Sequence, residues 1–138
     1  LLGRFHAWGP TKEVVAALAY QRGVPYNPCI FETGEDGTGI PLEGYEHTGL
    51  RQVGASGLHC AMVRTTAIKK LRAAGIKQYF GGFENKLGED MAWSANLKKV
   101  GIPLWCDTEL ISGHLGWTVE VDEAFRRAWI AQGRPGLG

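Results

Sequence analysis

The segment GEDMAWSANLKKVGIPLWCD, residues 88–107, predicts a helix, a turn and a strand in direct succession. Acidic side chains favour the first turn of a helix and basic ones the last, because of the helix dipole. The pair Glu89-Asp90 and the pair Lys98-Lys99 fit these two ends. Gly101 and Pro103 then stop the helix, which we expect to run from Glu89 to Lys99.

Short apolar runs alternate with Gly- and Pro-rich stretches elsewhere in the chain. The run from Val14 to Gln21 lies between Pro10 and the stretch 23–25, which favours a buried strand over a helix. Short strands mixed with helices indicate an α/β or α+β protein. The other expected elements are a helix ending at Trp8, a hairpin within 25–45 that uses Cys29–Phe31, strands at 50–53, 61–63 and 104–106, a tight turn at 54–57, a helix over 66–74 capped by Thr65, a turn at 111–116 and a helix over 121–132.

The composition excludes several classes of partner. With 138 residues the chain is long enough for one domain, and we expect residues 132–138 to form a tail. Fifteen basic and fourteen acidic residues leave a net charge of +1, so the chain lacks the strong excess of basic residues that is typical of nucleic-acid-binding proteins. No apolar run reaches the ~20 residues that span a bilayer. The three cysteines form no CxxC pair, which favours a reducing, cytoplasmic setting.

The phase of the expected helix turns Asp90 toward the protein. Asp90, Trp93 and Leu97 lie at i, i+3 and i+7, on one stripe of a helix, and the two apolar residues must face the core. A carboxylate placed there needs a partner: a substrate hydroxyl, a metal or backbone donors of the preceding glycine-rich loop. It is suited to act as a general base toward a hydroxyl group. The alternative is that Glu89-Asp90 only caps the helix.

His114 is a candidate metal ligand. It lies in the run SGHLG, residues 112–116, where small neighbours let the backbone bring an imidazole close to a ligand. A lone histidine in a loop also fits a structural or exposed role. A zinc site built from Cys60, Cys106, His59 and His114 does not have the spacing of a known zinc finger.

Several runs, taken in order, resemble the end of a GT-A-fold glycosyltransferase domain of the family-two type. The resemblance extends over nearly the whole chain, from Leu1 to Phe125. The family's pattern is an acidic pair that opens a helix, a glycine, a strand ending in Asp, and a His before a small residue. The runs that match are YQRGVPY (20–26), GASGLHCAMVR (54–64), GEDMAW (88–93), KKVGIPLWCD (98–107) and GHLG (113–116).

The resemblance implies a partial GT-A fold, with a mixed sheet and flanking helices, that transfers a sugar from a nucleotide-diphosphate sugar to a carbohydrate or other hydroxyl acceptor. Asp90 would then be the catalytic base and Glu89 would position the acceptor. His114 would bind a divalent metal, Mn²⁺ or Mg²⁺, since both accept oxygen ligands and imidazole favours Mn²⁺. The acceptor-binding residues would be Gly54, Gly57, His59 and Trp93.

One part of the family's pattern is absent from this sequence. The DxD metal motif and the nucleotide-binding βαβ units do not precede the strand that ends near Tyr20. We therefore expect a chain that lacks the N-terminal, donor-binding half, has that half as a partner and is inactive alone. One alternative is a non-catalytic carbohydrate-binding or assembly module with the same fold. Another is a metal hydrolase built on Glu89, Asp90 and His114, although no HExxH motif occurs.

Overall fold

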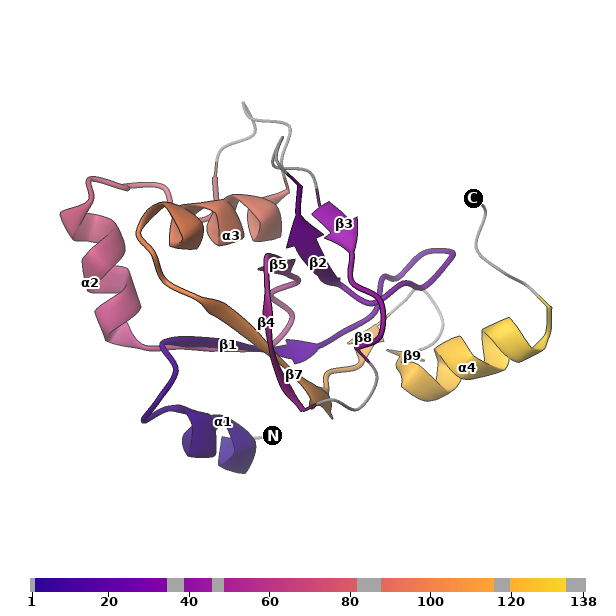
Figure 1. The fold of residues 1–138 in the computed structure, drawn as a ribbon. Helices are drawn as coiled ribbons and strands as arrows, with labels where there is room; N and C mark the ends of the chain where they lie inside the picture. Colours follow the sequence, from indigo (N-terminus) through magenta and orange to yellow (C-terminus); the bar gives the residue numbers. More distant parts are fainter. Residues whose placement is uncertain (1, 35–38, 46–48, 82–87, 116–119, 134–138) are drawn as a thin grey trace.

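The computed structural model describes residues 2–34, 39–45, 49–81, 88–115 and 120–133, and Figure 1 shows their arrangement. The helices are α1 (Leu2–Trp8), α2 (Thr65–Ala73), α3 (Glu89–Lys99) and α4 (Glu123–Ala131). The strands are β1 (Val14–Leu18), β2 (Ile30–Thr33), β3 (Gly39–Pro41), β4 (Leu50–Val53), β5 (Ala55–Ser56), β6 (Ala61–Val63), β7 (Leu104–Ile111), β8 (His114–Leu115) and β9 (Glu120–Val121).

A four-stranded mixed sheet, in the order β4-β7-β1-β6, forms the centre of the fold. Strand β1 runs parallel to β7 and antiparallel to β6, and β4 is antiparallel to β7. All five residues of β1 are buried, as expected for a strand covered on both faces. The chain is therefore an α/β protein with a mixed sheet and flanking helices.

The two faces of β1 belong to two hydrophobic clusters. Val14 and Leu18 pack in the larger cluster with Trp93 and Leu97 of α3, on the side that carries α2 and α3 in Figure 1. Val15 and Ala17 face the other side, where Phe5 of α1 covers the sheet. The alternation follows from the twofold period of a strand, and it holds α3 firmly against the sheet.

A second sheet, in the order β3-β2-β5, lies next to α3. Strands β2 and β3 form the hairpin expected within 25–45. The tight turn expected at Gly54–Gly57 is wrong, because Ala55 and Ser56 form β5 and pair with β2. Small residues allow this close pairing, since a Cβ on Gly54 would lie 2.5 Å from the backbone nitrogen of Thr33.

Most of the expected elements are present, with some different boundaries. Helix α3 runs from Glu89 to Lys99 as predicted, and Gly101 follows it with φ +68°. Thr65 is not the cap of α2: the helix begins at Thr65, and Arg64 occupies the cap position without a side-chain hydrogen bond. Strand β7 continues past Cys106 to Ile111, and His114 lies in β8 rather than in a turn.

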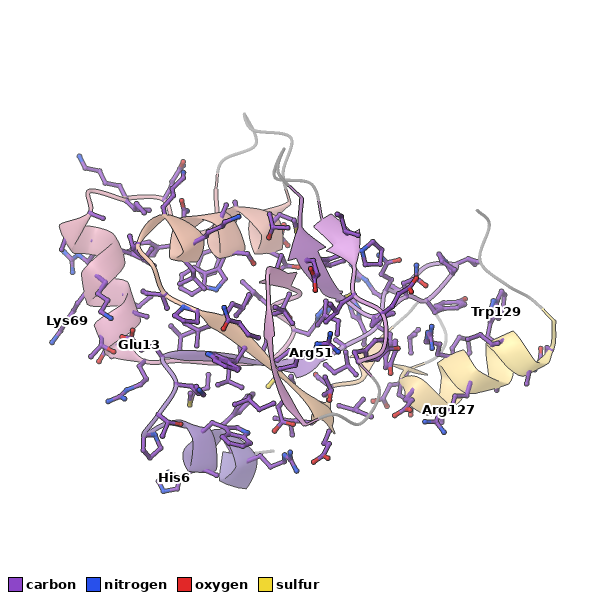
Figure 2. All side chains as sticks on the ribbon, viewed as in Figure 1. His6, Glu13, Arg51, Lys69, Arg127 and Trp129 are labelled. Carbon is purple, nitrogen blue, oxygen red and sulfur yellow. The ribbon has the colours of Figure 1, made fainter. Side chains whose placement is uncertain are left out.

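Side-chain contacts connect α2 and α4 to the rest of the fold, and Figure 2 labels one residue of each contact, Glu13 and Trp129. Glu13, just before β1, accepts a hydrogen bond of 2.6 Å from Lys70 of α2, whereas Lys69 points away from the sheet. On α4, Trp129 packs edge-on against Tyr26, with ring centroids 5.0 Å apart. Asp122 caps α4 by accepting a hydrogen bond from the Phe125 amide, so this helix begins two residues later than predicted. None of the helices in the described ranges is long and apolar enough to cross a bilayer.

Candidate active-site cleft

One cleft, of about 420 Å³, collects side chains from five separate parts of the chain. The first turn of α3 and the strand β8 contribute the charged and imidazole groups that the sequence singled out. The segments after β1 and β5, and the segment before α3, complete its walls. The lining residues are Arg22, Leu58, His59, Phe80, Glu89, Asp90 and His114.

Asp90 faces this cleft from a half-buried position, as the helical phase predicted. Its Oδ1 accepts a hydrogen bond of 3.1 Å from the backbone amide of Leu58. This backbone donor comes from the segment after β5. Burial raises the pKa of the Asp90 carboxyl, and Glu89 adds to this, while the Leu58 amide and His114 act in the opposite direction. A carboxylate with a raised pKa is a stronger proton acceptor than an exposed one.

Glu89 is the second carboxylate of the cleft. It is exposed at the first position of α3, next to Asp90 and one residue after the cap, Gly88. An exposed carboxylate loses little solvation when it accepts a hydrogen bond from a ligand hydroxyl. Glu89 is therefore placed to orient a ligand, whereas Asp90 is the more sheltered of the two acids.

His114 reaches the cleft from β8 with a fixed ring orientation. Its Nδ1 lies 2.9 Å from the carbonyl oxygen of Tyr20. A carbonyl only accepts hydrogen bonds, so Nδ1 carries a proton, and in the neutral form of the ring Nε2 keeps its lone pair. Among the described residues, Nε2 has no hydrogen-bond partner, which leaves this nitrogen for a ligand.

His59 lies directly against His114. The two rings meet edge to face, with centroids 3.9 Å apart. Partial burial lowers the pKa of His59, and the neighbouring His114 and Arg22 lower it further. Gly57 makes this position possible, because a Cβ there would come within 2.8 Å of the His59 ring. Of the four predicted acceptor-binding residues, His59 lines the cleft, and Gly57 does not line it but leaves room for the His59 ring.

Trp93 is only 1% exposed and does not line the cleft. Phe80 stacks on it, with centroids 5.1 Å apart and an angle of 20° between the rings. Phe80 is a lining residue that the sequence analysis missed, and Arg22 is another. The aromatic pair Tyr79-Phe80, in the segment between α2 and α3, was a usable signal for Phe80; for Arg22 the sequence offered no comparable one.

Gly54 lies away from the cleft. It borders a separate hollow of about 390 Å³ near Lys98 and Gly101, toward the C-terminal end of α3. Its amide donates to the carbonyl of Phe31 at 2.8 Å, so its part in the structure is to let β2 approach closely.

We expect Gly54→Ala to lower the free energy of unfolding by about 1–3 kcal/mol, because the added methyl would overlap the β2 backbone. Gly23→Ala is a matched control, since nothing lies within 4 Å of a Cβ at that position. Urea unfolding of both variants measures the difference. A Gly54→Ala protein as stable as Gly23→Ala would contradict the close packing of these strands.

His114 is the residue of the cleft best suited to a divalent metal. Metal-binding histidines usually donate their other ring N–H to a carbonyl or carboxylate, as His114 does to Tyr20. Within the described ranges, no group of three His, Cys, Asp or Glu side chains is arranged to hold an ion. His114 therefore fits as a single ligand, and a metal bound there would need further ligands from a bound molecule or from another part of the protein. The same result leaves the zinc site with Cys60 and Cys106 without support.

The cleft combines a sheltered carboxylate, an exposed carboxylate, an oriented imidazole and an exposed aromatic ring. Such a set can remove a proton from a hydroxyl and orient that hydroxyl, and His114 can supply a single ligand to a cation. No protein-family model matches the chain, and no curated protein matches it either. What the chain does must therefore be inferred from these residues.

Proposed function

We propose that this chain is the acceptor-side part of a GT-A-type glycosyltransferase. The observation that carries the proposal is that Asp90 and His114, which lie on α3 and β8, line the same cleft. These are the two residues to which the sequence resemblance gives the roles of base and metal ligand. The α/β fold with a mixed sheet is compatible with that family.

In the proposed reaction, Asp90 takes the proton of an acceptor hydroxyl while the hydroxyl oxygen attacks the anomeric carbon of the donor sugar. The bond from that carbon to the diphosphate breaks as the glycosidic bond forms, and the nucleoside diphosphate leaves with the electron pair. This single displacement inverts the configuration at the anomeric carbon. The raised pKa of Asp90 strengthens it as the proton acceptor.

The other residues of the cleft have supporting roles in this proposal. Glu89 accepts a hydrogen bond from the acceptor and so fixes the direction of the attacking hydroxyl. His114 would hold Mn²⁺ or Mg²⁺ through Nε2, and a metal held there would supply positive charge opposite the departing diphosphate. The guanidinium of Arg22, exposed at the same cleft, favours an anionic donor on that side.

A non-catalytic carbohydrate-binding or assembly module is the second candidate. It is favoured by the lack of a complete metal-ligand set among the residues that the structure describes. Such a module would use the same cleft and the exposed ring of Phe80, but it would turn over no donor. The two candidates therefore differ in catalysis and agree in sugar binding.

The test is a transfer assay on the natural full-length protein with UDP- and GDP-sugars, Mn²⁺ and a panel of simple glycosides. The enzyme is expected to release nucleoside diphosphate and to form a glycosylated product of inverted configuration. Sugar binding without either product, for every donor tested, would reject the enzyme and support the module.

In the same assay, His114→Ala is expected to raise the Mn²⁺ concentration for half-maximal activity by at least about 10-fold, because loss of a direct ligand should cost no less than the roughly 10-fold to 100-fold lost with an outer-shell partner. His6→Ala is the control, because His6 lies on α1 and takes no part in the cleft. Mn²⁺ titration of transfer, followed in parallel by the electron paramagnetic resonance of free Mn²⁺, measures the shift. An unchanged titration curve would remove His114 from the metal.

A further inference from the structure

Phe80 is an exposed aromatic ring at the wall of the cleft. Half of its surface, 50%, is open to solvent, and it shares the cleft with Glu89 and Asp90. Single exposed apolar side chains are common on protein surfaces, so exposure alone says little. The way in which this ring is held says more.

Three contacts fix the segment that carries Phe80 against α3. The side-chain amide of Asn96, itself buried, donates to the carbonyls of Gln78 at 3.1 Å and Tyr79 at 3.0 Å. Gly81 follows with φ +71°, and a Cβ there would lie 2.5 Å from the Cβ of Ala92. Only glycine allows the chain to pass so close to the helix in this conformation.

The third contact is the stack of Phe80 on Trp93. The rings are nearly parallel, and Trp93 is buried, so one face of Phe80 rests on the core and the ring is not free to fold away. An aromatic ring fixed in this way presents an apolar surface without the entropy cost of ordering it when a ligand binds.

We propose that Phe80, stacked on Trp93, is a binding platform for the apolar face of a pyranose ring, and that the acceptor is therefore a carbohydrate. This inference rests on the proposed glycosyltransferase function and narrows its acceptor from hydroxyl compounds in general to sugars. The platform places a sugar with its C–H groups on the ring and its hydroxyl groups toward Glu89 and Asp90.

The chemistry of the cleft favours a neutral sugar over other hydroxyl acceptors. A pyranose has one face of C–H groups, which suits an aromatic ring, and a rim of hydroxyls, which suits carboxylates. Next to Phe80 the two carboxylates disfavour an anionic acceptor such as a nucleic acid or a phosphorylated sugar, whereas the single guanidinium of Arg22 is assigned to the anionic donor. A serine or threonine side chain has no face that would cover Phe80.

The experiment measures binding to the chain without any donor. Saturation-transfer NMR, with irradiation of aromatic protons, is recorded with methyl glycosides of glucose, galactose, mannose and N-acetylglucosamine, and with glycerol as a hydroxyl compound that lacks a ring. We expect saturation of the ring protons of at least one glycoside and none of glycerol. Phe80→Ala is expected to weaken glycoside binding by about fivefold to tenfold, which is the usual worth of an aromatic contact.

Matched variants keep the result interpretable. Phe80→Leu retains an apolar side chain on Trp93 but removes the aromatic face, and it is expected to lose binding even if Phe80→Ala fails to fold. Phe80→Tyr is expected to restore it. Ile130→Ala removes an apolar side chain of equal exposure, 49%, on α4 and is expected to leave binding unchanged.

Two results would overturn the platform: no glycoside saturated above the glycerol level, or Phe80→Leu binding as well as the unchanged protein. Failure of the proposed function is a separate outcome. Glycoside binding that depends on Phe80, in a full-length protein that transfers no sugar from any donor, would reject the transferase and retain the platform as the site of a carbohydrate-binding module.

Discussion

Asp90→Asn is expected to lower the rate of sugar transfer by about 10²–10⁴-fold, the usual contribution of a general base. The substitution removes the basic oxygen but keeps the shape of the side chain and an acceptor for the Leu58 amide, which now bonds to Oδ1 at 3.1 Å. Acceptor binding is therefore expected to change little, so the loss appears in kcat rather than in KM. Steady-state kinetics on the natural full-length protein measure both constants.

Glu89→Gln is the matched control for this prediction, because Glu89 is the neighbouring carboxylate and lies at the same cleft. It is exposed and is proposed only to orient the acceptor, so its loss is expected to raise the KM of the acceptor more than it lowers kcat. Equal activity of Asp90→Asn and the unchanged protein would reject Asp90 as the base. A larger loss in kcat for Glu89→Gln would exchange the two roles.

The pH dependence of activity is a second test of Asp90 as the base. A base must be ionised to act, and burial raises the pKa of Asp90, so activity is expected to fall as the pH drops through this raised pKa. The acidic limb of the kcat/KM profile should therefore lie above the value of about 3.9 of an unperturbed aspartate.

The contribution of Asp90 to the free energy of unfolding has the opposite pH dependence to activity. Because the folded-state pKa of Asp90 is raised, its ionisation opposes folding as the pH rises through that value. Asp90→Asn is therefore expected to be at least as stable as the unchanged protein near neutral pH. Greater stability with lost activity would separate the catalytic role from a structural one.

The elements that could be predicted from the sequence are those determined by local chemistry. The charges at both ends of α3, with Gly101 beyond it, fixed its exact limits. The helical phase turned Asp90 inward, because Trp93 and Leu97 lie on the same stripe and had to be buried. Strand β7 was predicted to end at Cys106, because the charged residues Asp107 and Glu109 follow and charged residues usually end a buried strand. The partner that allows Asp107 into the sheet is Arg4, which is far away in the sequence.

The candidate site shows the same division between local and distant causes. His59, His114 and Asp90 meet because the segment after β5, strand β8 and helix α3 come together in the fold, and no local pattern encodes that meeting. Gly54 was assigned to the acceptor site through the family resemblance, but in the structure its small size serves the pairing of β2 and β5. Phe80 was not predicted as a site residue because its position depends on contacts of Gly81 and Asn96. These two residues are separated in the sequence by a stretch that includes residues 82–87, which lie outside the described part of the chain.

Asp107→Ala is expected to lower the free energy of unfolding by about 2–4 kcal/mol, because it removes a fully buried carboxylate that holds α1 to the sheet. Asp107 is 0% exposed. It accepts hydrogen bonds from Nε of Arg4 at 2.7 Å, from Nη2 of Arg4 at 2.9 Å and from Nε1 of Trp8 at 2.9 Å. Without it, the indole N–H of Trp8 loses this acceptor at a site where water has poor access.

Glu109→Ala is the control for this prediction, since Glu109 bonds the same Arg4 at 2.9 Å but is 44% exposed. An exposed ion pair contributes under about 1 kcal/mol, so a small change is expected. Urea unfolding of the three proteins, followed by circular dichroism, measures the difference. Equal stability of Asp107→Ala and Glu109→Ala would mean that α1 does not depend on Asp107 for its docking.

The pH dependence of unfolding identifies the charge as the cause. Burial alone would raise the pKa of Asp107, but the bonds from Arg4, Trp8 and the Glu109 amide outweigh it, and the pKa is lowered. A lowered folded-state pKa means that the stabilisation is complete above the unfolded value of about 3.9 and is lost as the pH falls toward the folded value. Asp107→Asn, which keeps the shape without the charge, is expected to lose less stability than the unchanged protein over this acidic range. If both lose the same amount, the loss belongs to other carboxylates, and the contacts with Arg4 and Trp8 then hold α1 through their geometry and not through the charge.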